Sequence, residues 1–258
     1  MRAILLMGLF VAALTLRAND VPDKAPTITT VIVPVVGNVL GENEVRWKTD
    51  IELRNNVGEE IIVALEPAGF EDRTIVETIE PGGVRRYTDV IQQAFGMDSA
   101  LVPLIVRTAG RRPVTIRATV YGVRGAETFP QLPIPISYSS PLSQARILSG
   151  LSFTSDHRTN VGISNLGGRP AHIVLGLQRL PGRTLAVSRI DVPPGTLHQV
   201  SIQTLFPLIT KGSDFAIVIE TSAPNIYVYA SVVENATNFA RFIEPAATHS
   251  LAFQRRGR

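Results

Sequence analysis

One alternating stretch occurs twice in this chain, first as Lys48-Thr49-Asp50-Ile51-Glu52-Leu53-Arg54-Asn55 and again, 110 residues later, as Arg158-Thr159-Asn160-Val161-Gly162-Ile163-Ser164-Asn165. In both occurrences the threonine, the aliphatic residues and the final asparagine share one side of the alternation. A period of two is typical of a β-strand with one buried face. Trp47 extends this side in the first occurrence, whereas His157 stands at the matching position of the second.

The similarity between the two parts of the chain continues beyond this stretch. Residues 61–65 align with residues 171–175, and residues 114–120 align with residues 226–232. The turn Pro81-Gly82 between them matches Pro194-Gly195. Because order and spacing are both kept, the sequence predicts two copies of one module of about 110 residues, a size at which each can bury a core of its own.

Apolar segments of strand length, separated by glycine- and proline-containing turns, recur throughout each copy. In the first copy they lie at residues 29–36, 60–65, 75–79, 101–108 and 114–123. Short strands at this spacing predict an all-β fold with two tandem β-sandwich domains, at residues 28–140 and 146–250. A single helical turn is expected in each copy, at residues 88–95 and 201–207.

The two ends of the chain have a different composition from its body. An apolar run follows Arg2 and becomes polar near Ala18, which predicts a secretory signal peptide at residues 1–18, then a linker at residues 19–27. Residues 251–258 form a basic tail. No later stretch has the length and hydropathy of a membrane span, so the mature chain is expected to be periplasmic or extracellular, with no membrane span.

The net charge of +3, from 25 Lys and Arg against 22 Asp and Glu, belongs to these ends. Without the arginines of the signal peptide and the tail, the body is slightly acidic. We therefore expect no nucleic-acid partner.

Residues that could perform catalysis are not arranged in known patterns. There is no cysteine, the four histidines lack metal-binding spacing, and no serine-nucleophile or phosphate-binding motif occurs. Lys48 and Arg54 flank Asp50 and Glu52 on the same strand face, which indicates a charge-balanced surface rather than a catalytic pair. We therefore expect a non-enzyme without cofactor or metal, while a calcium site stays an open alternative at the acidic positions Asp20, Asp23, Glu42, Asn43, Glu44 and Asp156.

Two features are candidates for binding. The repeated motif is either a ligand site used twice or a structural element, and its duplication favours structure; its members are Trp47, Thr49, Asp50, Asn55, Thr159, Asn160 and Asn165. The second candidate is the pair Tyr227 and Tyr229. If Ile226, Val228 and their alternating neighbours point inward, both rings lie on the opposite face, where they either bind a glycan or protein or are covered by another part of the chain.

With these motifs, and with Tyr229-Ala230-Ser231-Val232-Val233-Glu234-Asn235-Ala236-Thr237, the chain resembles secreted bacterial proteins of uncharacterised function built from tandem immunoglobulin-like β-sandwiches. The resemblance covers most of the mature chain and implies an extracytoplasmic, non-catalytic protein. It supplies no active site. Two-domain periplasmic pilus chaperones are similar in size and compartment, although their modules are not close repeats of each other.

The leading functional hypothesis is a secreted, non-catalytic binding or structural module of the cell envelope, for adhesion or for a glycan or protein interaction. The alternative is a periplasmic pilus-type assembly chaperone that acts by strand donation. The chaperone hypothesis predicts a long apolar edge strand with basic residues nearby. The glycan hypothesis predicts that Tyr227 and Tyr229 are exposed.

Overall fold

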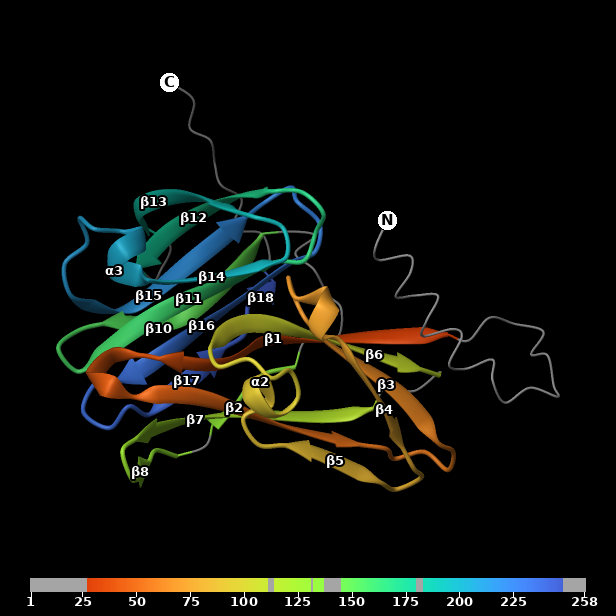
Figure 1. The fold of residues 1–258 in the computed structure, drawn as a ribbon. Coiled ribbons are helices and arrows are strands. Elements are labelled where there is room, and N and C mark those ends of the chain that lie inside the picture. The colour runs from red at the N-terminus through yellow and green to blue at the C-terminus, as the bar shows by residue number, and fades with distance from the viewer. Residues whose placement is uncertain (1–26, 111–113, 131, 137–144, 180–182, 248–258) are drawn as a thin grey trace.

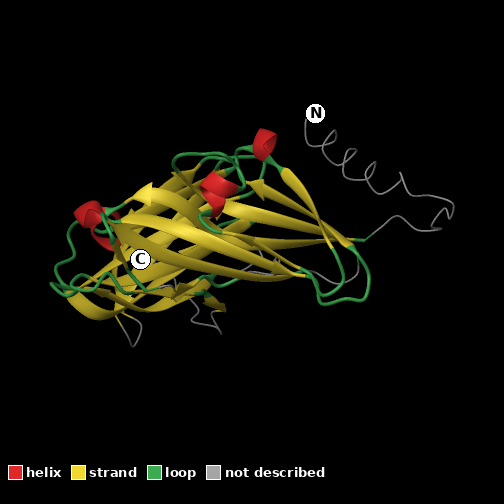
Figure 2. Ribbon diagram, turned by 60° about the horizontal axis from the view of Figure 1, so that its bottom comes forward, coloured by secondary structure: helices red, strands yellow, loops and turns green. Residues whose placement is uncertain are grey.

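The computed structural model describes residues 27–110, 114–130, 132–136, 145–179 and 183–247. The expected signal peptide, the linker as far as residue 26 and the basic tail lie outside these residues. The described chain is an all-β, sandwich-like structure of antiparallel strands with only short helical turns (Figures 1 and 2). We refer to residues 27–136 as the N-terminal half and to residues 145–247 as the C-terminal half.

Most strands of the N-terminal half follow the segments predicted from the sequence, whereas those at residues 84–87, 127–128 and 132–133 were not predicted. The strands are β1 (Ile28–Leu40), β2 (Arg46–Arg54), β3 (Ile61–Pro67), β4 (Ile75–Ile79), β5 (Val84–Tyr87), β6 (Ala100–Ala109), β7 (Thr115–Arg124), β8 (Glu127–Thr128) and β9 (Leu132–Pro133). Two 3-10 turns, η1 (Glu42–Glu44) and η2 (Glu71–Arg73), and the helical turn α2 (Val90–Gln93) connect them.

The C-terminal half repeats this order. Its elements are β10 (Arg146–Phe153), β11 (His157–Asn165), β12 (Ala171–Arg179), β13 (Arg183–Val192), β14 (Thr196–Ser201), α3 (Ile202–Leu205), β15 (Gly212–Glu220), β16 (Ile226–Glu234), β17 (Ala240–Ile243) and β18 (Ala246–Ala247). The expected helical turns are confirmed. Asp89 caps α2 by accepting a hydrogen bond from the Gln92 amide, and Ser201 caps α3 by accepting one from the Thr204 amide.

Strand pairing shows the same repeat. The order β4-β3-β6-β1 in the N-terminal half corresponds to β13-β12-β15-β10 in the C-terminal half, and β5-β2-β7 corresponds to β14-β11-β16. The C-terminal half has two separate sheets, of five and four strands. In the N-terminal half, β1 pairs with both β6 and β2, so all nine strands belong to one continuous sheet.

A break in β1 accompanies this difference between the halves. The register of β1 against β6 shifts between Val33 and Val36, on either side of Pro34. Proline has no N–H to donate to a ladder, which is why a proline within a sheet is confined to an edge or a bulge. Past this bulge, β1 pairs with β2 as well and joins the two layers.

Each half has a core made of the inward residues of its alternating strands. In β2, the side chains of Thr49, Ile51 and Leu53 are buried, and in β11 the same is true of Val161 and Ile163. The cores are in contact: Tyr229 of the C-terminal half packs into the apolar cluster of the N-terminal half, and the partly buried Leu197 and Phe242 pack against it. The two halves are therefore held together by a shared apolar contact.

Candidate functional site

The repeated asparagines make the same three hydrogen bonds. The side-chain amide of Asn55 donates to the carbonyls of Glu59 and Ile79, and its oxygen accepts from the Val57 amide. Asn165 donates to Arg169 and Val192 and accepts from Gly167. Both side chains are fully buried. Each binds the backbone of the turn that follows its own strand and the last carbonyl of a more distant strand, β4 or β13, and no ligand is needed to explain these bonds.

The repeated threonines also bond to local backbone. Thr49 accepts a hydrogen bond of 3.0 Å from the Gly37 amide in β1. Thr159 accepts from the Ser152 amide and donates to the Ser152 carbonyl in β10. Each hydroxyl thus ties its strand to the first strand of its own half.

Asp50 belongs to a polar network on the outer face of β2. Its carboxylate accepts a hydrogen bond from the Asp89 amide, and the Asp89 carboxylate accepts from Asn38 and pairs with Lys48 at 2.9 Å. Glu52 pairs instead with Arg86 of β5 at 2.8 Å. That hydrogen bond lowers the pKa of the Glu52 carboxyl. Arg86 of β5 therefore balances the charge of Glu52, while Lys48 pairs with Asp89.

Ionisation of Tyr121, which lies beside this network, should lower the free energy of unfolding at alkaline pH. Burial raises the pKa of Tyr121 to about 12, and the nearby carboxylates of Asp50 and Asp89 add to the shift. A tyrosine in an unfolded chain ionises near pH 10. Because the folded pKa is the higher one, this contribution to stability is present below about pH 10 and is lost as the pH rises to about 12. We expect the unfolding free energy of Tyr121→Phe to fall less steeply than that of the unsubstituted protein between about pH 10 and pH 12. Urea unfolding at a series of pH values measures this fall. Equal slopes for the two proteins would contradict the prediction.

The tyrosine pair proposed for ligand binding is buried. Tyr227 is 8% exposed and Tyr229 is 1% exposed, so the expectation that both rings are available to a ligand is wrong. Their alternating neighbours Ile226 and Val228 do point into the C-terminal core, as expected. The face opposite to that core is covered by the N-terminal half, and burial raises the pKa of the Tyr229 hydroxyl above its ordinary range.

The covered face has a different composition in the two halves. In the C-terminal half it presents Asn160, Gly162 and Ser164 from β11, whereas the aligned positions of β2 are Asp50, Glu52 and Arg54. Gly162 lies opposite Tyr229 and leaves room for its ring. The Ser164 hydroxyl donates to the Pro34 carbonyl at 3.4 Å. The loss of charge in the second copy is the sequence signal that could have identified this interface.

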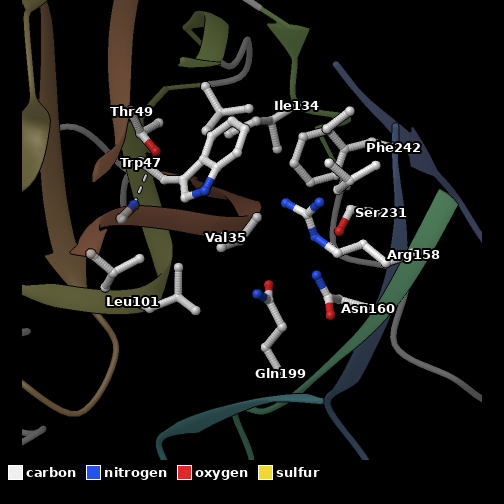
Figure 3. Close-up of a pocket in the computed structure, with 15 residues that line it drawn as sticks. Val35, Trp47, Thr49, Leu101, Ile134, Arg158, Asn160, Gln199, Ser231 and Phe242 are labelled. Atoms are coloured by element: carbon white, nitrogen blue, oxygen red, sulfur yellow. Dashed lines mark hydrogen bonds between the residues drawn. The ribbon is translucent and has the colours of Figure 1, made fainter. Parts of the chain in front are cut away.

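A pocket of about 100 Å³ lies where the halves meet (Figure 3). Trp47 and Thr49 line it from β2, and Arg158 and Asn160 line it from β11. The two occurrences of the repeated motif therefore face each other across this pocket. The repeat and its spacing do not predict that both occurrences line one pocket, because this placement depends on how the two halves pack.

Edge strands form a second candidate surface. Among the described strands, β13 pairs with β12 alone and β4 pairs with β3 alone. They differ in length, with ten residues in β13 and five in β4. Each exposes one valine, Val187 at 49% and Val76 at 53%.

Several arginines of the N-terminal half pair with carboxylates. Arg85 binds Glu77, Arg107 binds Glu66 and Arg124 binds Glu127. Within the described ranges, no three histidine, aspartate or glutamate side chains gather in a way that would hold a metal ion. Of the positions considered for calcium, Asp20 and Asp23 lie outside the described residues. No helix of the described chain has the length and hydropathy required to cross a membrane.

Comparison of the chain with protein-family models, with curated proteins and with solved structures finds no match.

Proposed function

We propose that this protein is a secreted, non-catalytic binding protein built from two tandem immunoglobulin-like β-sandwich domains, and that it binds an extended segment of a partner protein along β13. The observation that carries the proposal is the edge of β13 with which no other strand of the described chain pairs. An extended peptide adds to such an edge through main-chain hydrogen bonds, and pockets for alternate side chains provide specificity.

The length of β13 distinguishes it from an ordinary edge. Natural edge strands are short or carry charged residues and prolines, which prevents unwanted pairing. β13 carries charges at Arg183, Arg189 and Asp191, but it is ten residues long and has no proline. About half of its residues direct their N–H and C=O groups away from β12. Its outward side chains around Val187 combine an apolar group with the charges of Arg189 and Asp191. This surface suits a strand with both apolar and charged side chains.

The other parts of the proposal have separate support. The apolar run after Arg2 supports secretion. The matching strand order of the two halves supports two domains of one type. The pairing of carboxylates with arginines and lysines, as in Glu66 with Arg107, supports structural roles for these groups. The burial of Tyr227 and Tyr229 removes the support that these residues gave to a glycan ligand.

A peptide with the sequence of β12 tests strand addition, because residues 171–179 already pair antiparallel with β13. We expect the peptide to protect alternate amide protons of β13 from hydrogen exchange in the full chain. Val187→Lys should weaken binding about two- to fivefold, because it alters one cross-strand pair. Val76→Lys is the matched control, since Val76 has nearly the same exposure on the shorter edge β4. Protection confined to β4, or no protection in β13, would contradict the proposal.

The alternative of an assembly chaperone is favoured by one further observation. Arg183 and Arg189 are both exposed on β13. The expected sign of strand donation was a long apolar edge strand with basic residues nearby; β13 has the length and the basic residues, but its side chains are of mixed polarity. The test is the refolding yield of an immunoglobulin-like domain from which one edge strand has been deleted. A chaperone should raise this yield at equimolar concentration, whereas a binding module of another kind should leave it unchanged.

A further inference from the structure

The pocket between the two halves contains a positively charged group at its wall. Arg158 is 16% exposed at its side chain, and its guanidinium points into the space between Trp47 and Phe242 (Figure 3). Its terminal nitrogens donate to the side-chain oxygens of Asn235 at 2.7 Å and Asn238 at 3.3 Å. These bonds fix the guanidinium in place. Since each terminal nitrogen carries two N–H groups, one on each stays available.

The acidic group nearest to Arg158 does not fill the pocket. Glu42 of η1 approaches the Nε atom of Arg158 at 3.4 Å, and its side chain is 72% exposed. Glu42 therefore pairs from the solvent side and leaves the terminal nitrogens unopposed by a carboxylate. The pocket keeps a positive wall.

Other donors around the pocket lack partners within the described chain. The Trp47 indole N–H, the Asn160 amide and the Ser231 hydroxyl make no side-chain hydrogen bond with the described residues, although Ser231 is only 7% exposed. Gln199 accepts a hydrogen bond from the Tyr229 hydroxyl with its amide oxygen, which leaves its NH₂ group as a further donor. Donors thus outnumber acceptors, as suits a ligand group that only accepts.

The remaining walls are apolar and the space is small. Val35, Leu101, Val120, Ile134 and Phe242 form these walls. A volume of about 100 Å³ suits a ligand of a few non-hydrogen atoms. A ligand with a charged hydrogen-bond acceptor and a short hydrocarbon chain matches both the donor-rich wall and the apolar walls of the pocket.

We propose that this pocket binds a small aliphatic monocarboxylate, with the carboxylate on Arg158, Asn160 and Ser231 and the hydrocarbon part against Val35, Leu101 and Ile134. This site is separate from β13 and extends the proposed function to a small-molecule ligand. Because both halves line the pocket, such a ligand bridges them.

Trp47 is the only tryptophan of the chain and lines the pocket, so its fluorescence reports on occupancy. We expect butyrate to change this fluorescence saturably, with a dissociation constant on the order of 1 mM for a ligand of this size. Butyramide, which has the same shape without the charge, should bind at least tenfold more weakly. Inorganic phosphate, an anion without an apolar part, should also bind at least tenfold more weakly.

The decisive variant is Asn160→Asp, which changes one atom type and adds a negative charge to the pocket. Asp50 occupies the aligned position of the N-terminal half, so a strand of this type accommodates the carboxylate. We expect at least a tenfold loss of butyrate affinity. Asn56→Asp makes the same change at an exposed position outside the pocket and should leave affinity unaltered.

Three results would overturn the proposal. They are the absence of saturable butyrate binding to the full chain, equal binding of butyrate and butyramide or phosphate, and unchanged butyrate affinity in Asn160→Asp.

A blocked peptide with one glutamate side chain tests whether the carboxylate belongs to a partner protein instead. Binding of that peptide without binding of butyrate would also overturn the proposal of a free monocarboxylate. Hydrogen exchange at β13 separates all these outcomes from strand addition.

Discussion

Replacing Asn165 by alanine should lower the unfolding free energy by about 3 kcal/mol, since it removes three hydrogen bonds, one of them buried and two partly buried. The groups affected are the carbonyls of Arg169 and Val192 and the amide of Gly167. Asn165 itself is 1% exposed, so water cannot replace the lost bonds without opening the turn. Denaturant unfolding followed by circular dichroism measures the effect.

The repeat supplies an internal test of this expectation. Asn55→Ala removes the equivalent bonds of the N-terminal half and should cost a similar amount. Asn56→Ala is the matched control, because Asn56 makes one exposed bond to Thr115 and its loss should cost less than about 1 kcal/mol. A cost below about 1 kcal/mol for Asn165→Ala would show that the turn does not depend on its asparagine.

Unfolding of Asn165→Ala also tests whether the two halves unfold together. Trp47 lies in the N-terminal half, while Asn165 lies in the C-terminal half. Tyr229 packs into the N-terminal core, so loss of the C-terminal half should also destabilise the surroundings of Trp47. We therefore expect the fluorescence and circular dichroism transitions of Asn165→Ala to coincide. Two separate transitions would show that the shared contact does not couple the halves.

Much of the fold could be predicted from local patterns. Strict alternation identified β2 and β11, because a strand with one buried face repeats every two residues. Glycine- and proline-containing turns marked their ends, and the repeat implied that both halves share a strand order. Two of the three bonds of Asn55 and of Asn165 are also local, since they join a strand end to the turn that follows.

The features that were missed are not local. The bulge at Pro34 lets β1 join two layers, and a proline within an apolar run does not specify which strands it will pair with. The pocket combines side chains from both halves, as far apart as Val35 and Phe242. The covered face of β11 carries small and polar residues such as Asn160 and Ser164 instead of an apolar stripe. Its burial therefore depends on tertiary packing that hydrophobic periodicity does not encode.

Substituting Gly162 by alanine should destabilise the full chain by about 3 kcal/mol, because the new methyl group has no space. A Cβ atom at this position would lie 2.1 Å from Cε1 and 2.2 Å from Cζ of Tyr229. The ring cannot move away freely, since Tyr229 is 1% exposed and its hydroxyl donates a hydrogen bond to Gln199. Thermal or denaturant unfolding of the variant measures the loss.

The glycine is needed for the interface rather than for the strand. Glu52 occupies the aligned position in β2, opposite Arg117 of β7, so the same place in the sheet holds long side chains where the face is exposed. Gly168→Ala is the matched control, because no atom lies within 4 Å of a Cβ built there. It should change stability by less than about 0.5 kcal/mol.

A double-mutant cycle separates the clash with Tyr229 from any other effect of the methyl group. Tyr229→Ala alone should cost about 3 to 5 kcal/mol, since it empties a buried site between the halves. In that background the added methyl of Gly162→Ala enters vacant space, so its cost should fall below about 1 kcal/mol. The coupling between the two substitutions is then about 2 kcal/mol or more. Strict additivity would mean that the cost of Gly162→Ala does not come from the clash with the Tyr229 ring, which lies opposite it in the same sheet and packs into the N-terminal core.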